Sequence, residues 1–171
     1  MLLWHLGIAT VIVYVTLGRR RIDYRMILVG AVLPDVVDGA LGLFYFDGPT
    51  GRWIAHSMLA AMAVTVVIIA VFKGQRRQSL FGLGVGWLLH LVADGMWRAP
   101  QTFLWPAFGG EFSDAPTEPY GWDLFADPGA HLSTWGGELV GLAVLAWFWV
   151  AFRLGEDGRL RLFLSDGYLR P

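Results

Sequence analysis

The sequence contains no cysteine and few charged side chains. None of its 171 residues is a cysteine, and aspartate, glutamate, lysine and arginine together make up 16% of the chain. Without thiols the protein forms no disulfide and has no thiolate to act as a nucleophile or metal ligand. In an ordinary soluble domain about a quarter of the residues are charged. The shortage of charge therefore argues against a soluble domain.

Long hydrophobic runs take the place of the missing charge. Hydrophobic residues make up 56% of the chain, and the mean hydropathy is +0.52. A helix needs roughly 20 mostly apolar residues to cross the hydrocarbon of a bilayer. Stretches of about this length lie at 2–18, 26–46, 53–72, 79–97 and 131–153. We therefore expect an all-α fold, a polytopic membrane helical bundle with about five transmembrane helices, the second of them broken at Pro34.

The basic residues predict how this bundle is oriented. We expect one transmembrane bundle over 1–154, with an external loop at about 96–130, and a polar tail over 155–171. Most lysines and arginines fall in every second segment between the hydrophobic stretches, so the positive-inside rule places these segments in the cytoplasm. The protein is then a multi-pass protein of the inner (plasma) membrane with its N-terminus outside and its C-terminus cytoplasmic. The three basic groups are Arg19, Arg20, Arg21 and Arg25; Lys73, Arg76 and Arg77; and Arg153, Arg159, Arg161 and Arg170.

The few ionisable residues inside the hydrophobic stretches predict a buried polar site. Such a side chain is costly in hydrocarbon unless it is paired, ligated or faces water. A helix rises about 1.5 Å per residue, so with this orientation each predicted helix places at least one of them in the outer half of the membrane. They are the four histidines His5, His56, His90 and His131, with the carboxylates Asp35, Asp38, Asp94 and Glu138.

The spacing and chemistry of these residues indicate a metal site. Imidazole and carboxylate without thiol suit a divalent cation, zinc or manganese above all, and several carboxylates would allow one or two ions. The alternative is that the polar residues only tie helices together by hydrogen bonds. Three pairs have a spacing that places both members on one face of a helix: His90 with Asp94, Asp35 with Asp38, and His131 with Glu138.

Several short elements follow one another in a recognisable order: His5, Leu33-Pro34-Asp35 with Asp38, the segment from Arg52 to His56 and Ser57, His90 with Asp94, and Trp105-Pro106. With these elements, residues 1 to about 110 resemble a family of membrane-bound, metal-dependent hydrolases of bacterial and archaeal inner membranes, some of whose members are LexA-regulated. The resemblance implies a membrane protein with a metal site. Departures from the family pattern are Gly51, Trp53 and Ala55, where the family usually has histidine, glycine and threonine.

The leading hypothesis is a membrane-embedded metal hydrolase that cleaves a phosphoester or related bond of a lipid at the outer leaflet with metal-activated water. Asp38 is a further ligand or an orienting residue, Arg52 clamps a phosphate, and Glu138 or His131 is the general base or an additional ligand. No nucleic-acid partner is expected. The predicted metal ligands are His5, Asp35, His56, His90 and Asp94.

Other functional classes remain open. The departures from the family pattern favour a non-enzymatic membrane subunit or assembly factor of a larger complex, with a structural metal or only the scaffold. Haem binding by paired histidines is a further class, although carboxylates stand beside nearly every histidine. Ion transport would need a polar path into the cytoplasmic half, where the predicted helices offer almost no ionisable residue.

Overall fold

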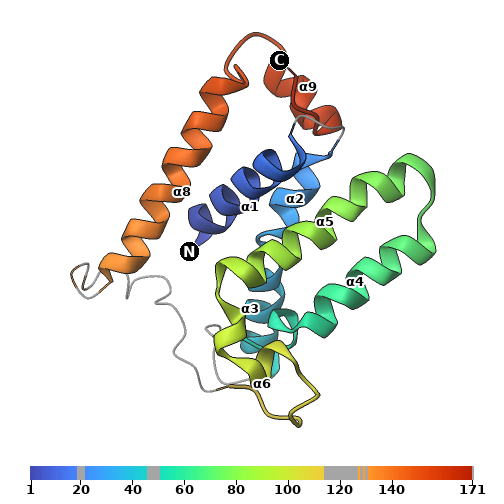
Figure 1. Cartoon of the computed structure of the whole chain (residues 1–171), viewed down its shortest axis with the longest axis vertical. Coiled ribbons are helices and arrows are strands. Elements are labelled where there is room, and N and C mark those ends of the chain that lie inside the picture. Colours follow the sequence, from blue (N-terminus) through green and yellow to red (C-terminus); the bar gives the residue numbers. More distant parts are fainter. Residues whose placement is uncertain (19–21, 46–50, 114–126, 128, 130, 171) are drawn as a thin grey trace.

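A computed structural model of the chain describes residues 1–18, 22–45, 51–113, 127, 129 and 131–170. This part of the protein contains helices and turns and no strand, which confirms the predicted all-α class for these ranges (Figure 1). The α-helices are α1 (Leu2–Leu17), α2 (Tyr24–Gly30), α3 (Leu33–Tyr45), α4 (Met58–Val71), α5 (Gly74–Ala93), α6 (Pro100–Phe103), α8 (Leu132–Ala151) and α9 (Arg159–Asp166), and the 3₁₀ turns are η1 (Ile54–His56) and η2 (Met96–Arg98).

Two helical segments of the described structure are long and apolar enough to cross a membrane. They are Tyr24–Phe44, which joins α2 and α3, and Leu132–Ala151, which is α8. The apolar helices α1 and α4 have 16 and 14 residues, which correspond to about 24 and 21 Å against a hydrocarbon core of about 30 Å. The predicted number of five spans therefore stays a prediction.

The second hydrophobic stretch is broken, as the sequence predicts, but just before Pro34. The helix stops after Gly30 and resumes at Leu33, with Ala31 and Val32 in a turn. Pro34 is the second residue of α3, where a missing N–H costs little because the first N–H groups of a helix have no partner within it. The break leaves the Ala31 carbonyl free to accept a hydrogen bond from outside the two helices.

Helix α1 lies between α8 and α5 (Figure 1). Glycines allow the close approach to α8: a Cβ added at Gly7 would lie 2.7 Å from the Cα of Gly141, and one added at Gly141 would lie 2.1 Å from the Leu3 carbonyl oxygen. On the other side, the indole N–H of Trp4 donates to the Ala93 carbonyl at the end of α5 over 3.2 Å. These contacts fix the start of α1 beside the C-terminal end of α5.

Helix α5 also packs against α2 and forms an antiparallel hairpin with α4 (Figure 1). A Cβ at Gly86 would lie 2.1 Å from the Ile27 carbonyl oxygen, so the two backbones approach as closely as glycine permits. The last turn of α5 thereby comes to lie against the break between α2 and α3.

The predicted tail folds back onto the other end of the bundle. It contains α9, and the N–H of Tyr24 donates to the Gly167 carbonyl over 3.0 Å. The Asp23 carboxylate is almost fully buried there and accepts hydrogen bonds from Arg25 and Ser79. Burial opposes ionisation of Asp23, but these hydrogen bonds outweigh it and hold its pKa below the usual value.

Large apolar side chains stay exposed on α4 and α8, which is typical of a surface that faces lipid or a partner. On α4 they are Leu59, Met62, Val66, Val67, Ile69 and Val71, and on α8 they are Leu132, Leu139, Val140, Leu142, Trp147, Trp149 and Val150.

The predicted orientation is testable by cysteine labelling, because the chain has no cysteine of its own. Glu111 follows α6, Gln75 lies at the start of α5, and both side chains are exposed. With the N-terminus outside, Glu111→Cys should react with an impermeant maleimide in intact cells, whereas Gln75→Cys should react only after permeabilisation. Labelling of Gln75→Cys alone in intact cells would show that the orientation is the opposite of the predicted one. The unaltered chain gives the background labelling.

Candidate metal centre

The segment before α4 is held by one buried carboxylate. Oxygens of Asp38, which is fully buried, accept hydrogen bonds from the backbone N–H groups of Trp53, Ala55 and His56 over 2.6, 2.9 and 3.2 Å. The Ser57 hydroxyl oxygen caps α4 by accepting from the Ala60 N–H. The predicted helix over 53–72 is therefore wrong at its start. Residues 54–56 form a 3₁₀ turn whose N–H groups bind Asp38, and α4 begins only at Met58.

This correction changes how Arg52 reaches the site. The sequence places Arg52 one helical turn from His56, but Arg52 precedes η1 and lies in no helix. Its guanidinium Nε instead forms an ion pair with Asp94, at 3.1 Å from Oδ2. Arg52 therefore approaches the polar cluster from the side of α5, through a carboxylate.

Asp38 also fixes the tautomer of the His56 imidazole. The Nδ1 of His56 lies 2.7 Å from Asp38 Oδ2, and a carboxylate oxygen only accepts, so Nδ1 carries the proton. In the neutral ring the other nitrogen, Nε2, then has a free lone pair. Asp38 thus holds the His56 ring in place, and its predicted role as a metal ligand or as a residue that orients one stays a prediction.

The broken helix fixes His90 in the same way. The Nδ1 of His90 lies 2.8 Å from the Ala31 carbonyl oxygen, the group freed by the break between α2 and α3. Nδ1 is therefore the donor, and Nε2 carries the lone pair. A carbonyl at the break needs a partner on sequence grounds, but the sequence does not identify that partner as His90.

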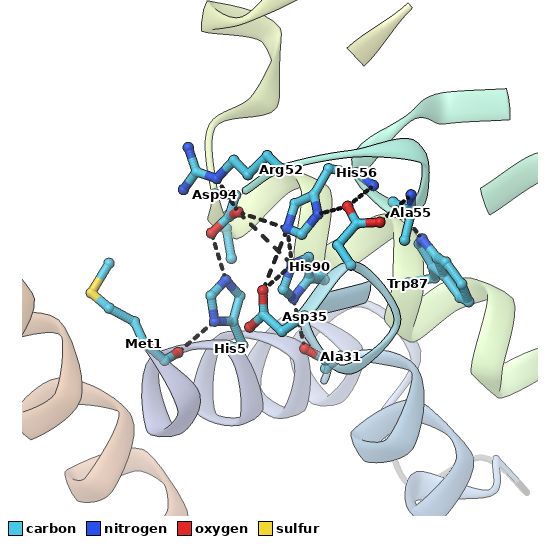
Figure 2. A network of polar contacts seen from close by, with 12 residues as sticks. Met1, His5, Ala31, Asp35, Arg52, Ala55, His56, Trp87, His90 and Asp94 are labelled. Carbon is cyan, nitrogen blue, oxygen red and sulfur yellow. Dashed lines mark hydrogen bonds and ion pairs between the residues drawn. The ribbon is translucent and has the colours of Figure 1, made fainter. Parts of the chain in front are cut away.

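The two free nitrogens face one another. His56 Nε2 and His90 Nε2 are 3.1 Å apart, and both side chains are at most 2% exposed. Two lone pairs at this distance repel unless a proton or a cation lies between them. Figure 2 shows both rings pointing into the centre of the cluster from η1 and α5.

Two carboxylates complete the cluster. Asp35 Oδ1 lies 3.4 and 3.5 Å from the Nε2 atoms of His56 and His90, and Asp94 Oδ2 lies 3.4 and 3.8 Å from the same atoms. Metal–ligand bonds of 2.0–2.2 Å place adjacent ligands of one ion about 2.8 to 3.6 Å apart. Asp35 is 41% exposed and Asp94 is 5% exposed, so the open side of the cluster is at Asp35.

His5 contacts the cluster through Asp94. Its ring stacks on that of His90 with centroids 4.2 Å apart, its Nε2 lies 2.8 Å from Asp94 Oδ1, and its Nδ1 contacts the Met1 carbonyl. Both nitrogens therefore have partners, and His5 orients Asp94. Ligand atoms of His5, His90 and Asp94 also form a second group with mutual distances within 4.8 Å, beside the group of Asp35, His56 and His90.

The remaining predicted site residues lie elsewhere. Glu138 accepts the Leu3 N–H over 2.8 Å and lies 3.9 Å from the Met1 nitrogen, so it contacts the first turn of α1. His131 directly precedes α8, and neither residue belongs to a group of described side chains that could share an ion. Their catalytic or metal-binding roles stay predictions. The acidic residues of 114–126 in the predicted external loop lie outside the described residues.

If Asp38 orients His56 as a metal ligand, Asp38→Asn should weaken metal binding while leaving every ligand atom in the chain. Loss of such an orienting carboxylate costs about 10- to 100-fold in metal affinity. The affinity is measured by competition with a chromophoric chelator, beside the unfolding temperature in detergent. Asp23→Asn is the matched control, because it alters a buried, hydrogen-bonded carboxylate at the other end of the bundle. Equal affinity losses in the two variants would show that only stability is affected.

A comparison with protein-family models assigns the chain to a family. The model of the YdjM inner membrane protein family matches residues 2–158. No curated protein matches the chain, and no solved structure matches it. The family description supports the predicted location in the inner membrane and gives no activity. Because the match covers most of the chain, the protein belongs to the YdjM inner membrane protein family.

Proposed function

We propose that this protein is an integral membrane, metal-dependent hydrolase that cleaves a phosphoester or related bond of a lipid at the outer leaflet. The observation that carries the proposal is the close approach of His56 Nε2 and His90 Nε2, whose Nδ1 atoms each have an oxygen partner. Two such nitrogens beside two carboxylates need a proton or a cation between them, and a divalent cation offsets more of the buried negative charge than a proton does.

The donor set fits a divalent ion. His56, His90, Asp35 and Asp94 would hold it, and two imidazoles with two carboxylates suit zinc or manganese. When bound, such an ion supplies a water activated as a nucleophile near neutral pH and polarises the phosphoryl oxygen. Its positive charge also offsets the cost of placing Asp94 among buried side chains. A second ion beside His5 and Asp94 belongs to the same proposal.

The chain's own residues position the reactants. Asp38 and the Ala31 carbonyl hold the two imidazoles in one tautomer, and His5 holds Asp94. Arg52 forms an ion pair with Asp94 in which Nε is 3.1 Å from Oδ2, and its guanidinium would also bind an oxygen of a substrate phosphate.

A lipid is the proposed substrate because of the location of the site. The family belongs to the inner membrane, and with five spans and the N-terminus outside, the cluster lies below the outer surface. A lipid head group reaches such a depth more easily than a soluble polymer does. The short helices α1 and α4 would then lie in a locally thinned bilayer.

The second candidate is a membrane subunit or assembly factor with a structural metal. Gly51, Trp53 and Ala55 favour it, because they replace residues that are usual in the related hydrolases. Trp53 and Ala55 nevertheless contribute their N–H groups to Asp38, and the cluster does not need their side chains. The two candidates differ in turnover and agree on metal binding.

The test is hydrolysis by the purified full chain in vesicles of mixed phospholipids, with products followed by mass spectrometry. Zinc or manganese should support turnover, a chelator should abolish it, and restoring the metal should recover it. His90→Ala removes one proposed ligand and should lower the rate about 100-fold or more, together with the metal content. The unfolding temperature of the same samples shows whether the variant is folded.

Each outcome separates the candidates. Metal in the unaltered chain, lost in folded His90→Ala, without hydrolysis of any lipid supports the subunit with a structural metal. Hydrolysis that survives both chelation and His90→Ala contradicts the proposed mechanism. Equal metal content in the two proteins contradicts the metal site itself.

A further inference from the structure

A cavity of about 550 Å³ lies beside the metal centre, between α1, the end of α5, η2 and α8. Asp94 and Arg52 border it, so the cavity and the metal centre share a wall. Its other walls come from Met1, Trp4 and Ile8; Val92, Ala93 and Gly95; Trp97 and Arg98; and Ser133, Gly136, Gly137 and Val140.

The charged side chains of this cavity are two arginines and one aspartate. Arg52 forms an ion pair with Asp94 through Nε. The exposed Arg98 side chain lies near the Trp97 ring, with its Cζ 6.0 Å from the ring centroid, and no carboxylate of the described residues pairs with it. Because Asp94 is the only acidic residue of the lining, the described walls carry an excess of positive charge.

Apolar side chains line the same cavity. Trp4 and Ile8 come from α1, and Val140 comes from the facing side of α8. Val92 and Val140 are about half exposed and Trp97 is 56% exposed. The hydrogen bond from Trp4 to the Ala93 carbonyl holds this wall against α5. The guanidinium groups in one part of the cavity suit an anionic head group, and the exposed indole and aliphatic groups in another part suit an apolar chain. The cavity therefore suits an anionic amphiphile.

We propose that this cavity binds the phosphate head group of a membrane lipid, with Arg52 and Arg98 contacting the phosphate oxygens and an acyl chain lying against Trp4, Ile8 and Val140. The binding stands on the cavity itself, and its role as the substrate site rests on the proposed function. Since Arg52 contacts Asp94, a phosphate held by Arg52 lies beside a proposed metal ligand. Arg98, which the sequence did not single out, then selects the substrate.

The two arginines favour a phosphate that bears only negative charge. A guanidinium forms paired hydrogen bonds with phosphate oxygens, whereas a choline head group would bring a cation close to Arg52 and Arg98. Free phosphate would use the arginines and gain nothing from the apolar wall. The preferred ligand is therefore phosphatidic acid or a related lipid with an exposed phosphate.

The test is lipid binding by the purified full chain in detergent, treated with a chelator so that no hydrolysis interferes. Native mass spectrometry measures the binding of phosphatidic acid, phosphatidylcholine with the same acyl chains, and inorganic phosphate. Phosphatidic acid should bind at least about tenfold more tightly than the other two, and Arg98→Gln should remove about tenfold of its affinity. Arg77→Gln, which changes an exposed arginine near the start of α5, should leave the affinity unchanged.

Each possible result supports or contradicts the proposed head-group site. Equal affinity for the two lipids, or equal effects of Arg98→Gln and Arg77→Gln, overturns the head-group site. Inorganic phosphate that binds as tightly as phosphatidic acid overturns the role of the apolar wall. Selective lipid binding without metal-dependent hydrolysis would refute the proposed function and leave this site standing, and the reverse result would refute this site alone.

Discussion

The rest of the structure depends on the close approach of two imidazole nitrogens in a buried cluster. His56 and His90 face one another through Nε2 atoms 3.1 Å apart, and because each Nδ1 already donates to an oxygen, a proton or a cation must lie between the two Nε2 atoms. Burial removes the water that would otherwise separate the lone pairs. Asp35 and Asp94 add negative charge at the same point, so the cluster needs a positive charge to be stable.

The surrounding elements of the fold bring the residues of this cluster together. The break between α2 and α3 exposes the Ala31 carbonyl that orients His90, and α3 carries Asp35 and Asp38 to the same place. Asp38 in turn binds the N–H groups of the turn that contains His56. The contact of α1 with the end of α5, through Trp4 and Ala93, brings His5 against Asp94. Each of these elements is irregular or tightly packed where it contacts the cluster.

Some of this arrangement could be predicted from the sequence. The helical spacing of His90 and Asp94 and the break near Pro34 follow from local rules, and both are present. The hydrogen bonds of Asp38 to the segment before α4 could not be predicted, because they join residues about 15 to 18 positions apart outside any repeating pattern. Hydropathy likewise did not distinguish the short α4 from a full span, since Ser57 caps the helix within the apolar run.

X-ray absorption spectroscopy of the zinc-loaded full chain tests the proposed metal centre most directly. Zinc held between His56 and His90 should show scattering from two imidazole rings together with oxygen ligands, at about 2.0 to 2.2 Å. His56→Ala should reduce the imidazole contribution to one ring. A spectrum with oxygen ligands alone, or one that is unchanged in His56→Ala, would contradict the account.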